Sequence, residues 1–197
     1  MQGLLNISRI IDRINSRIGQ WLSWLILIAV LVSSGNAIIR KMFDVSSNAW
    51  LELQWVLFSA VFLLCSPWTL LSNEHIRIDI VNSLFPKKVR NLIDVTGHLL
   101  FLLPLTIVMI VTSYPFFMAS WRINEQSMNA GGLPQWPAKV LVLLCFVMLL
   151  FQAISEFIKR VAIMRGILDD TASGGGHHAA AEEEAKRLLA GLKTENH

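Results

Sequence analysis

WLSWLILIAVLVSSGNAII, residues 21–39, decides how this chain folds, because the stretch contains no charged side chain. A helix needs about 20 predominantly apolar residues to cross the hydrocarbon core of a bilayer. Three further stretches of similar length and polarity follow, at residues 50–71, 95–118 and 138–158. The chain is therefore predicted to be an all-α integral membrane protein with four membrane-spanning helices.

The composition of the whole chain also indicates a membrane environment. Of its 197 residues, 54% are apolar and only 16% are charged, whereas about 25% are charged in an average soluble domain. The net charge of +3 does not indicate a nucleic-acid partner, because the basic residues flank the apolar stretches and form no patch of their own. Seven Trp against one Tyr fits a membrane protein, since Trp favours the membrane interface.

Residues 1–17 form a short amphipathic segment, with isoleucines at helical spacing on one face and arginines on another. We predict a helix lying on the membrane surface, either separate from the first span or continuous with it. The apolar run that follows is too long for a cleavable signal peptide and should stay as a helix. Residues 18–165 then form the four-helix transmembrane domain, and residues 166–197 a flexible linker and a solvated tail.

The distribution of Lys and Arg predicts the orientation, because cytoplasmic connections are enriched in basic residues. Ten such residues lie on one side of the predicted spans: Arg9, Arg13, Arg17, Arg77, Lys87, Lys88, Arg90, Lys159, Arg160 and Arg165. Four lie on the other side: Arg40, Lys41, Arg122 and Lys139. We therefore expect a multi-pass protein of the bacterial inner membrane with both termini in the cytoplasm and short periplasmic loops at 40–49 and 119–137.

The connection between the second and third spans is too apolar for a plain loop. Asn73 is a good helix cap, and apolar residues then recur on one face up to Leu84, with His75 and Asp79 largely elsewhere. This pattern predicts a short cytoplasmic interfacial helix. The alternation of isoleucines over 76–80 would also suit a strand, but a lone strand edge is costly beside lipid.

Several polar residues inside or beside the spans need an explanation. Glu52 lies near the start of the second span, where a carboxylate must reach either water or a partner. It either extends to the interface or anchors another helix or subunit, and Gln54 and Trp55 follow it with an amide and a large ring. Asn36 and Gln152 have side chains suited to hydrogen bonding between helices.

The sequence gives no support for catalysis or for a bound cofactor. It contains no Gly-rich phosphate loop, nucleophile elbow or HExxH pattern. Cys65 and Cys145 both lie inside apolar runs and suggest packing, and the adjacent pair His177 and His178 is a poor metal site. Haem is also not expected, because no span but the third contains a histidine. We expect no enzyme activity, cofactor or metal.

Specific motifs, in order along the four spans, carry a resemblance to a known family. Glu52-Leu53-Gln54-Trp55 opens the second span, Asn73-Glu74-His75-Ile76-Arg77-Ile78-Asp79 follows it, Gly131-Gly132-Leu133-Pro134-Gln135-Trp136-Pro137-Ala138-Lys139 opens the fourth span, and Glu156 closes it. Over about residues 15–165 the chain resembles the small membrane subunit, or Q component, of tripartite ATP-independent periplasmic (TRAP) transporters.

The resemblance implies a partnership. A periplasmic binding protein delivers an organic acid, and a large membrane subunit carries it inward by an elevator-type movement driven by a sodium gradient. The small subunit would be a static scaffold beside that elevator, in contact with both partners and with membrane lipid. Candidate subunit-interface or membrane-anchoring residues are Glu52, Gln54, Trp55, His75, Arg77, Asp79, Pro134, Trp136, Pro137, Lys139 and Glu156.

Two other functions compete with the scaffold: an independent small channel or carrier, and a membrane subunit of a redox complex. Independent transporters place polar groups near the bilayer midplane. No Asp, Glu, Lys, Arg or His stands at the centre of any predicted span, which favours the scaffold.

Overall fold

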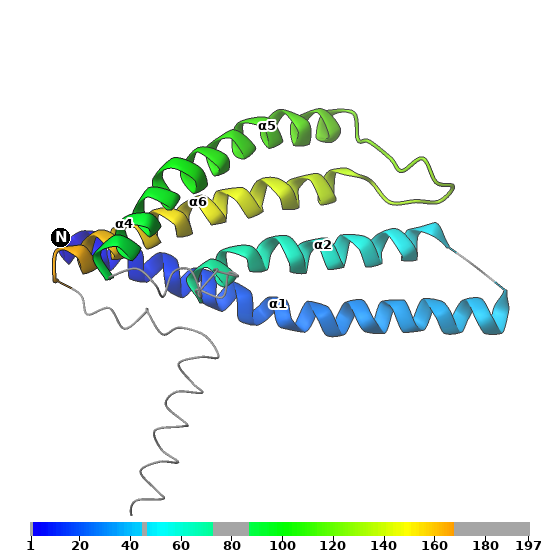
Figure 1. Cartoon of the computed structure of the whole chain (residues 1–197). Coiled ribbons are helices and arrows are strands. Elements are labelled where there is room, and N and C mark those ends of the chain that lie inside the picture. The colour runs from blue at the N-terminus through cyan, green and yellow to red at the C-terminus, as the bar shows by residue number, and fades with distance from the viewer. Residues whose placement is uncertain (1, 45–46, 73–86, 168–197) are drawn as a thin grey trace, which may run out of the picture.

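Figure 1 shows the chain as a computed structural model, which describes residues 2–44, 47–72 and 87–167. The described helices are α1 (Gln2–Phe43), α2 (Asn48–Leu71), α4 (Lys87–Gly97), the π-helical turn η1 (His98–Leu102), α5 (Leu103–Arg122) and α6 (Trp136–Met164). No strand occurs among these residues, apart from one isolated bridge. The predicted interfacial helix at 74–84 and the tail at 168–197 lie outside the described residues.

Four helical segments are long and apolar enough to cross a membrane: Gln2–Phe43, Asn48–Leu71, Val95–Arg122 and Trp136–Met164. The predicted fold class, all-α with four membrane-spanning helices, is confirmed at this level. The segment 1–17 that we expected as an amphipathic unit belongs, from Gln2 onward, to the same helix as the first span. At 1.5 Å per residue, the 42 residues of α1 extend about 63 Å, roughly twice the hydrocarbon thickness.

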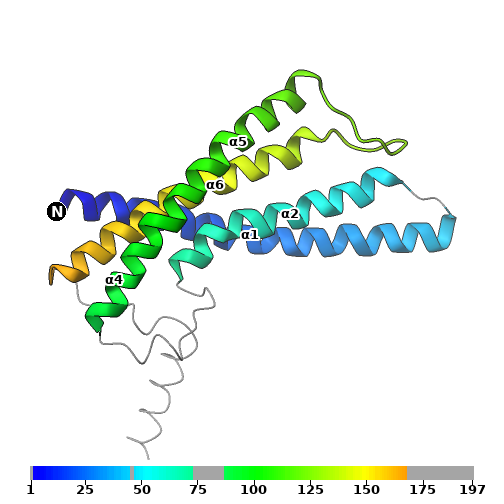
Figure 2. The same cartoon turned by 45° about the horizontal axis from the view of Figure 1, so that its top comes forward.

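The helices form an open layered array of two hairpins (Figures 1 and 2). α1 packs against α2, α5 packs against α6, and α6 is the central helix, since it also contacts α2 and α1. Small side chains permit this close approach, because Ala29 and Ala153 are fully buried. The N-terminal part of α1 lies beside the C-terminal part of α6, so these two segments meet at one end of the array (Figure 1).

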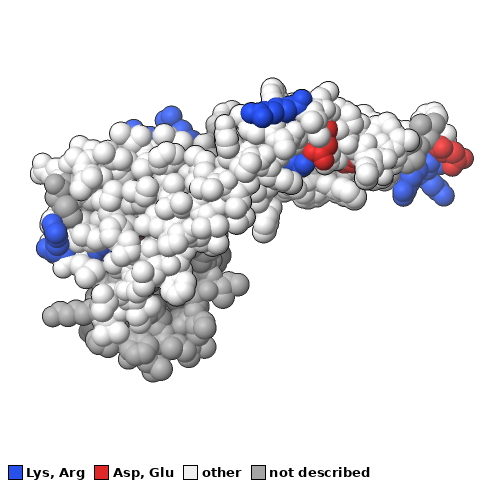
Figure 3. All heavy atoms as spheres, turned by 90° about the horizontal axis from the view of Figure 1, so that it is seen from above, with Lys and Arg blue, Asp and Glu red and all other residues white. Residues whose placement is uncertain are grey.

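The C-terminal end of α1, the N-terminal end of α2 and the connection 123–135 between α5 and α6 lie at the opposite end of the array, which we call the loop end (Figure 1). Over the face seen in Figure 3, charged side chains gather toward the two ends of the array and near the α5–α6 connection, and most of the surface between them is uncharged. Many large apolar side chains are accordingly exposed along the spans. Lipid covers such surfaces without an energetic penalty, because its tails are as apolar as leucine.

A wide π-helical turn joins α4 to α5. Its hydrogen bond runs from the Leu103 N–H to the His98 carbonyl. Pro104 follows at once; it has no N–H, and its ring would clash with the carbonyl four residues earlier in a regular α-helix. The wider turn relieves that conflict, and the ribbon arches at this point (Figure 1).

Candidate functional site: two polar ties at opposite ends of the helix array

Glu52 is buried in the first turns of α2, with only 7% of its surface exposed. Its Oε1 atom accepts hydrogen bonds from the Ser127 hydroxyl and, at 2.8 Å, from the Asn129 amide. Its Oε2 atom accepts one from the Leu133 backbone N–H at 2.6 Å. A buried carboxylate is tolerated only with such partners. We call Glu52 with Ser127, Asn129 and Leu133 the loop clasp.

All three donors belong to the connection 123–135, which folds as a small hairpin. Backbone hydrogen bonds run from the Ser127 N–H to the Leu133 carbonyl (3.1 Å) and from the Gln135 N–H to the Glu125 carbonyl (2.8 Å). The clasp therefore joins the first helical hairpin, through α2, to the connection that closes the second hairpin.

Two glycines make this connection fit against Glu52. Gly131 has a φ of 71°, in the left-handed region that favours glycine. A Cβ atom on Gly132 would lie 2.5 Å from the Cβ of Ser127 and 2.8 Å from Oε1 of Glu52. Only glycine allows the backbone to approach the carboxylate this closely.

Further contacts hold the same connection. The Asn48 side chain donates to the Ala130 carbonyl at 3.0 Å. Lys139 forms an ion pair with Glu125, and its ammonium lies 4.3 Å from the centre of the Phe116 ring, a cation–π contact. The hydrogen bond from the Lys139 ammonium lowers the pKa of the Glu125 carboxyl below its ordinary value of 4.5.

At the other end of the array, α1 and α6 share seven polar side chains. They are Ser8, Asp12 and Asn15 of α1 and Gln152, Ser155, Glu156 and Lys159 of α6. Gln152 and Ser155 are fully buried. We call these residues the α1–α6 polar cluster.

Most members of this cluster have more than one partner. Gln152 accepts from the Asn15 amide at 2.7 Å and donates to Asp12 and Glu156 at 3.0 and 3.1 Å. Ser155 donates to Asp12 at 2.7 Å, because a carboxylate can only accept. The Lys159 ammonium bonds both Asp12, at 3.1 Å, and Glu156.

The structure places several of the predicted residues together. Glu52 meets the connection that contains the Gly131–Pro134 motif, and Pro134 pairs with Gln126 in the isolated bridge. The Trp136 ring lies edge-on to Trp121 with the ring centres 4.6 Å apart. Pro137 lies in the first turn of α6, where a missing N–H does no harm.

Other predicted residues lie apart from the loop clasp. Glu156 belongs to the α1–α6 polar cluster. Gln54 is half-buried, whereas Trp55 is exposed on the outer side of α2. His75, Arg77 and Asp79 lie outside the described residues.

The clasp donors Ser127 and Asn129, and the cluster members Ser8, Asp12, Asn15 and Ser155, were not singled out from the sequence. Helical spacing offered a signal for part of the cluster, because Ser8, Asp12 and Asn15 recur at intervals of four and three on one face of α1.

No group of three or more His, Cys, Asp or Glu side chains suited to a metal occurs in the parts of the chain that the structure describes. The hydrogen bonds and ion pairs of the loop clasp and of the α1–α6 polar cluster hold helices together.

Four membrane-crossing helices tied at both ends by polar contacts define a multi-pass membrane protein. A family model described as "Tripartite ATP-independent periplasmic transporters, DctQ component" matches residues 29–162. The chain belongs to this family, and it is therefore a small membrane component of a TRAP transporter. The family is one of transporter components and not of enzymes. No curated protein and no solved structure matches the chain.

Proposed function

We propose that this chain is the fixed scaffold of its transporter, standing beside a large membrane subunit that moves by an elevator mechanism. In this proposal a periplasmic binding protein delivers an organic acid, and a sodium gradient drives its uptake across the bacterial inner membrane. Both termini of the chain lie in the cytoplasm, so the loop end faces the periplasm.

The observation that carries the proposal is that the helix array is tied at both ends. The loop clasp joins α2 to the α5–α6 connection, and the α1–α6 polar cluster joins the first helix to the last. Helices joined at both ends keep their register and tilt, which is what a moving neighbour needs from a support.

Two exposed features suit contacts with the partners. Met128 is fully exposed at the tip of the connection and Ile123 is 72% exposed beside it, so this connection offers an apolar tip to the binding protein. Trp55 is 66% exposed on α2, and it offers a rigid lateral contact to the large subunit. His75, Arg77 and Asp79 remain candidates for docking and depth-setting at the cytoplasmic surface.

Reconstitution tests the proposal. Proteoliposomes containing the large subunit and the binding protein are compared with and without this chain, and a third set contains this chain alone. We expect sodium-driven uptake only in the complete set. Full uptake without this chain would refute the scaffold role, and uptake by this chain alone would establish an independent carrier instead.

A covalent tie tests whether the scaffold stays fixed during transport. In a background with Cys65 and Cys145 changed to Ala, Glu52→Cys and Ser127→Cys are joined by a short bifunctional methanethiosulfonate reagent. We expect the joined protein to support uptake at least as well as the same protein after reduction. Loss of uptake on joining, with recovery on reduction, would mean that the loop end opens in each cycle.

A further inference from the structure

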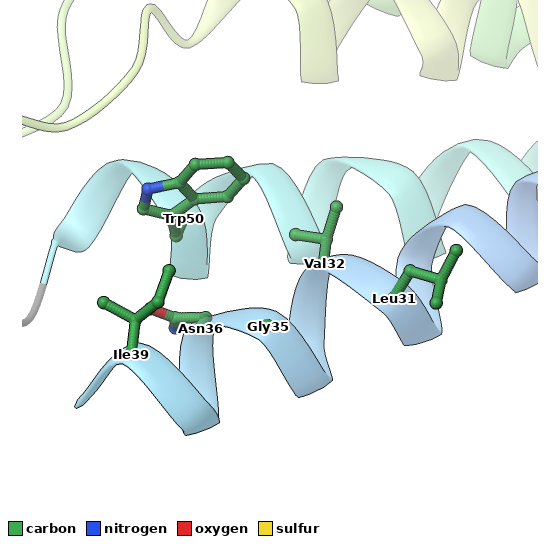
Figure 4. A pocket seen from close by; sticks show the side chains of 6 residues that line it. All are labelled: Leu31, Val32, Gly35, Asn36, Ile39 and Trp50. Carbon is green, nitrogen blue, oxygen red and sulfur yellow. The ribbon is translucent and has the colours of Figure 1, made fainter. Parts of the chain in front are cut away.

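A groove opens between α1 and α2 near the loop end (Figure 4). The proposed scaffold role does not involve this groove. Its volume is about 260 Å³, below the roughly 300–1,000 Å³ typical of sites for drug-sized ligands. It is lined by Leu31, Val32, Gly35, Asn36, Ile39 and Trp50. The groove therefore has the size and polarity for part of a hydrocarbon chain.

Gly35 lines the groove and contributes no side chain to it. A Cβ atom at this position would meet no other atom within 4 Å, so there is room beside Gly35 for a larger side chain. Glycine is unfavourable in the interior of a helix, by about 1 kcal/mol relative to alanine. In contrast to Gly132, its presence here is not required by a close backbone approach.

A basic side chain and an amphipathic aromatic side chain lie near one end of the groove. Arg40 is exposed and follows Asn36 by four residues, so it lies one turn further along the same face of α1. It belongs to the last turn of the helix, as does Lys41. Trp50 contributes an indole from the first turn of α2 (Figure 4), and Trp rings prefer the level of the lipid headgroups.

We propose that this groove binds one anionic phospholipid, with an acyl chain between α1 and α2 and the headgroup phosphate at Arg40. The apolar lining of the groove suits the acyl chain of the lipid, and the Arg40 cation beyond its end suits the negatively charged headgroup. A basic side chain near the membrane surface favours an anionic lipid over a neutral one by about fivefold.

Native mass spectrometry of the full chain in mild detergent tests this site. The protein is incubated with equal amounts of dioleoylphosphatidylglycerol and dioleoylphosphatidylcholine, and the retained lipids are counted. We expect about fivefold more phosphatidylglycerol than phosphatidylcholine on the unaltered protein. Arg40→Gln should bring that ratio close to one. The matched control Arg122→Gln, at the same end of the array but on α5, should leave the ratio unchanged.

A second pair of variants tests the acyl-chain groove. Gly35→Leu fills the empty space and should remove bound lipid of both kinds. Gly3→Leu makes the same change in the same helix, also where a Cβ meets nothing within 4 Å, and should retain lipid. Circular dichroism confirms that both variants are helical; if Gly35→Leu does not fold, the arginine pair alone decides.

Three results would overturn the proposal. The first is an unchanged lipid ratio in Arg40→Gln, or an equal fall in Arg122→Gln. The second is displacement of phosphatidylglycerol by excess inorganic phosphate, which would indicate a site for soluble anions. The third is full lipid retention by folded Gly35→Leu together with weaker association with the large subunit, which would make the groove a protein contact.

Discussion

The two polar ties differ in how their bonds are distributed. In the loop clasp one carboxylate, Glu52, accepts all three hydrogen bonds that join α2 to the connection, and each donor is neutral. In the α1–α6 polar cluster two carboxylates, one ammonium, two amides and two hydroxyls share their partners. The clasp therefore depends on a single side chain, whereas the cluster keeps most of its bonds when one member is lost.

This difference in bonding follows from the kind of segment that each tie holds, a loop in one case and a pair of helices in the other. The connection 123–135 is not a helix, so its backbone groups need partners from elsewhere, and Glu52 supplies one for the Leu133 N–H. The helices α1 and α6 satisfy their own backbones, so their side chains are free to bond one another. The loop clasp therefore uses one backbone donor, the Leu133 N–H, beside two side-chain donors, whereas the α1–α6 polar cluster is held almost entirely by bonds between side chains.

The largest expected effect concerns the positions of the two ties, since the positive-inside pattern predicts that they lie on opposite sides of the membrane. In a background without Cys65 and Cys145, a single cysteine at Met128 should react with an impermeant thiol reagent in cells with a permeable outer membrane. One at Thr171 should react only after the inner membrane is disrupted. The reverse pattern would invert the topology and place the clasp in the cytoplasm.

Removal of the single acceptor should free the whole connection. Glu52→Ala leaves three donors without their carboxylate, and hydrogen bonds to charged groups are among the stronger ones. We expect amide exchange across residues 125–135 to accelerate about tenfold or more, with a smaller change in Glu52→Gln, which keeps one acceptor oxygen. Gln54→Ala, two residues along the same helix, is the control. Equal exchange in Glu52→Ala and the control would show that the clasp is not what holds the connection.

Removal of one cluster member should have a smaller effect. Gln152→Leu removes three hydrogen bonds and should lower the free energy of unfolding by about 1 kcal/mol, within the range for bonds between membrane helices. Asn15→Leu removes one bond and should cost less. The double variant should cost less than the sum of the two, because they share a bond. Strict additivity in denaturant titrations would contradict the shared network.

The smallest effect is a pH dependence at the loop end. Because the pKa of Glu125 is lowered in the folded state, its pairing with Lys139 is fully present above the ordinary pKa of 4.5 and is lost as the pH falls through the lowered value. We expect the stability difference between the unaltered protein and Lys139→Met to be constant from pH 7 to about 5 and to shrink below 4.5. A difference that grows on acidification would contradict this sign.

Much of the fold was predictable, because apolar length alone identifies a membrane-spanning helix. The four spans and the all-α class came from the runs at 21–39, 50–71, 95–118 and 138–158, and Glu52 was conspicuous as a carboxylate in such a run. Its partners were not, because Ser127 and Asn129 are ordinary loop residues and nothing in their spacing points to α2.

The α1–α6 polar cluster was predictable only in part. Gln152 and Glu156 stood out as polar residues in an apolar run, and both proved to bond within the cluster. Asp12 and Asn15 lie in a segment where polar residues are expected, and their helical spacing with Ser8 was the one signal that they share a face of α1. The amphipathic pattern of the first residues suggested a face toward lipid, but it could not reveal that the face with Ser8, Asp12 and Asn15 packs on α6.

The distance along the chain between the partners in the α1–α6 polar cluster sets an order of events during synthesis. Asn15 and Gln152 are 137 residues apart. At about 5–20 residues per second, a ribosome needs roughly 7 to 27 seconds between them. For that interval α1 is already in or at the membrane with Asp12 and Asn15 lacking their partners on α6. The polar contacts of the first helix are therefore completed only when the last helix arrives, and a chain truncated before α6 lacks every α6 partner of Asp12 and Asn15.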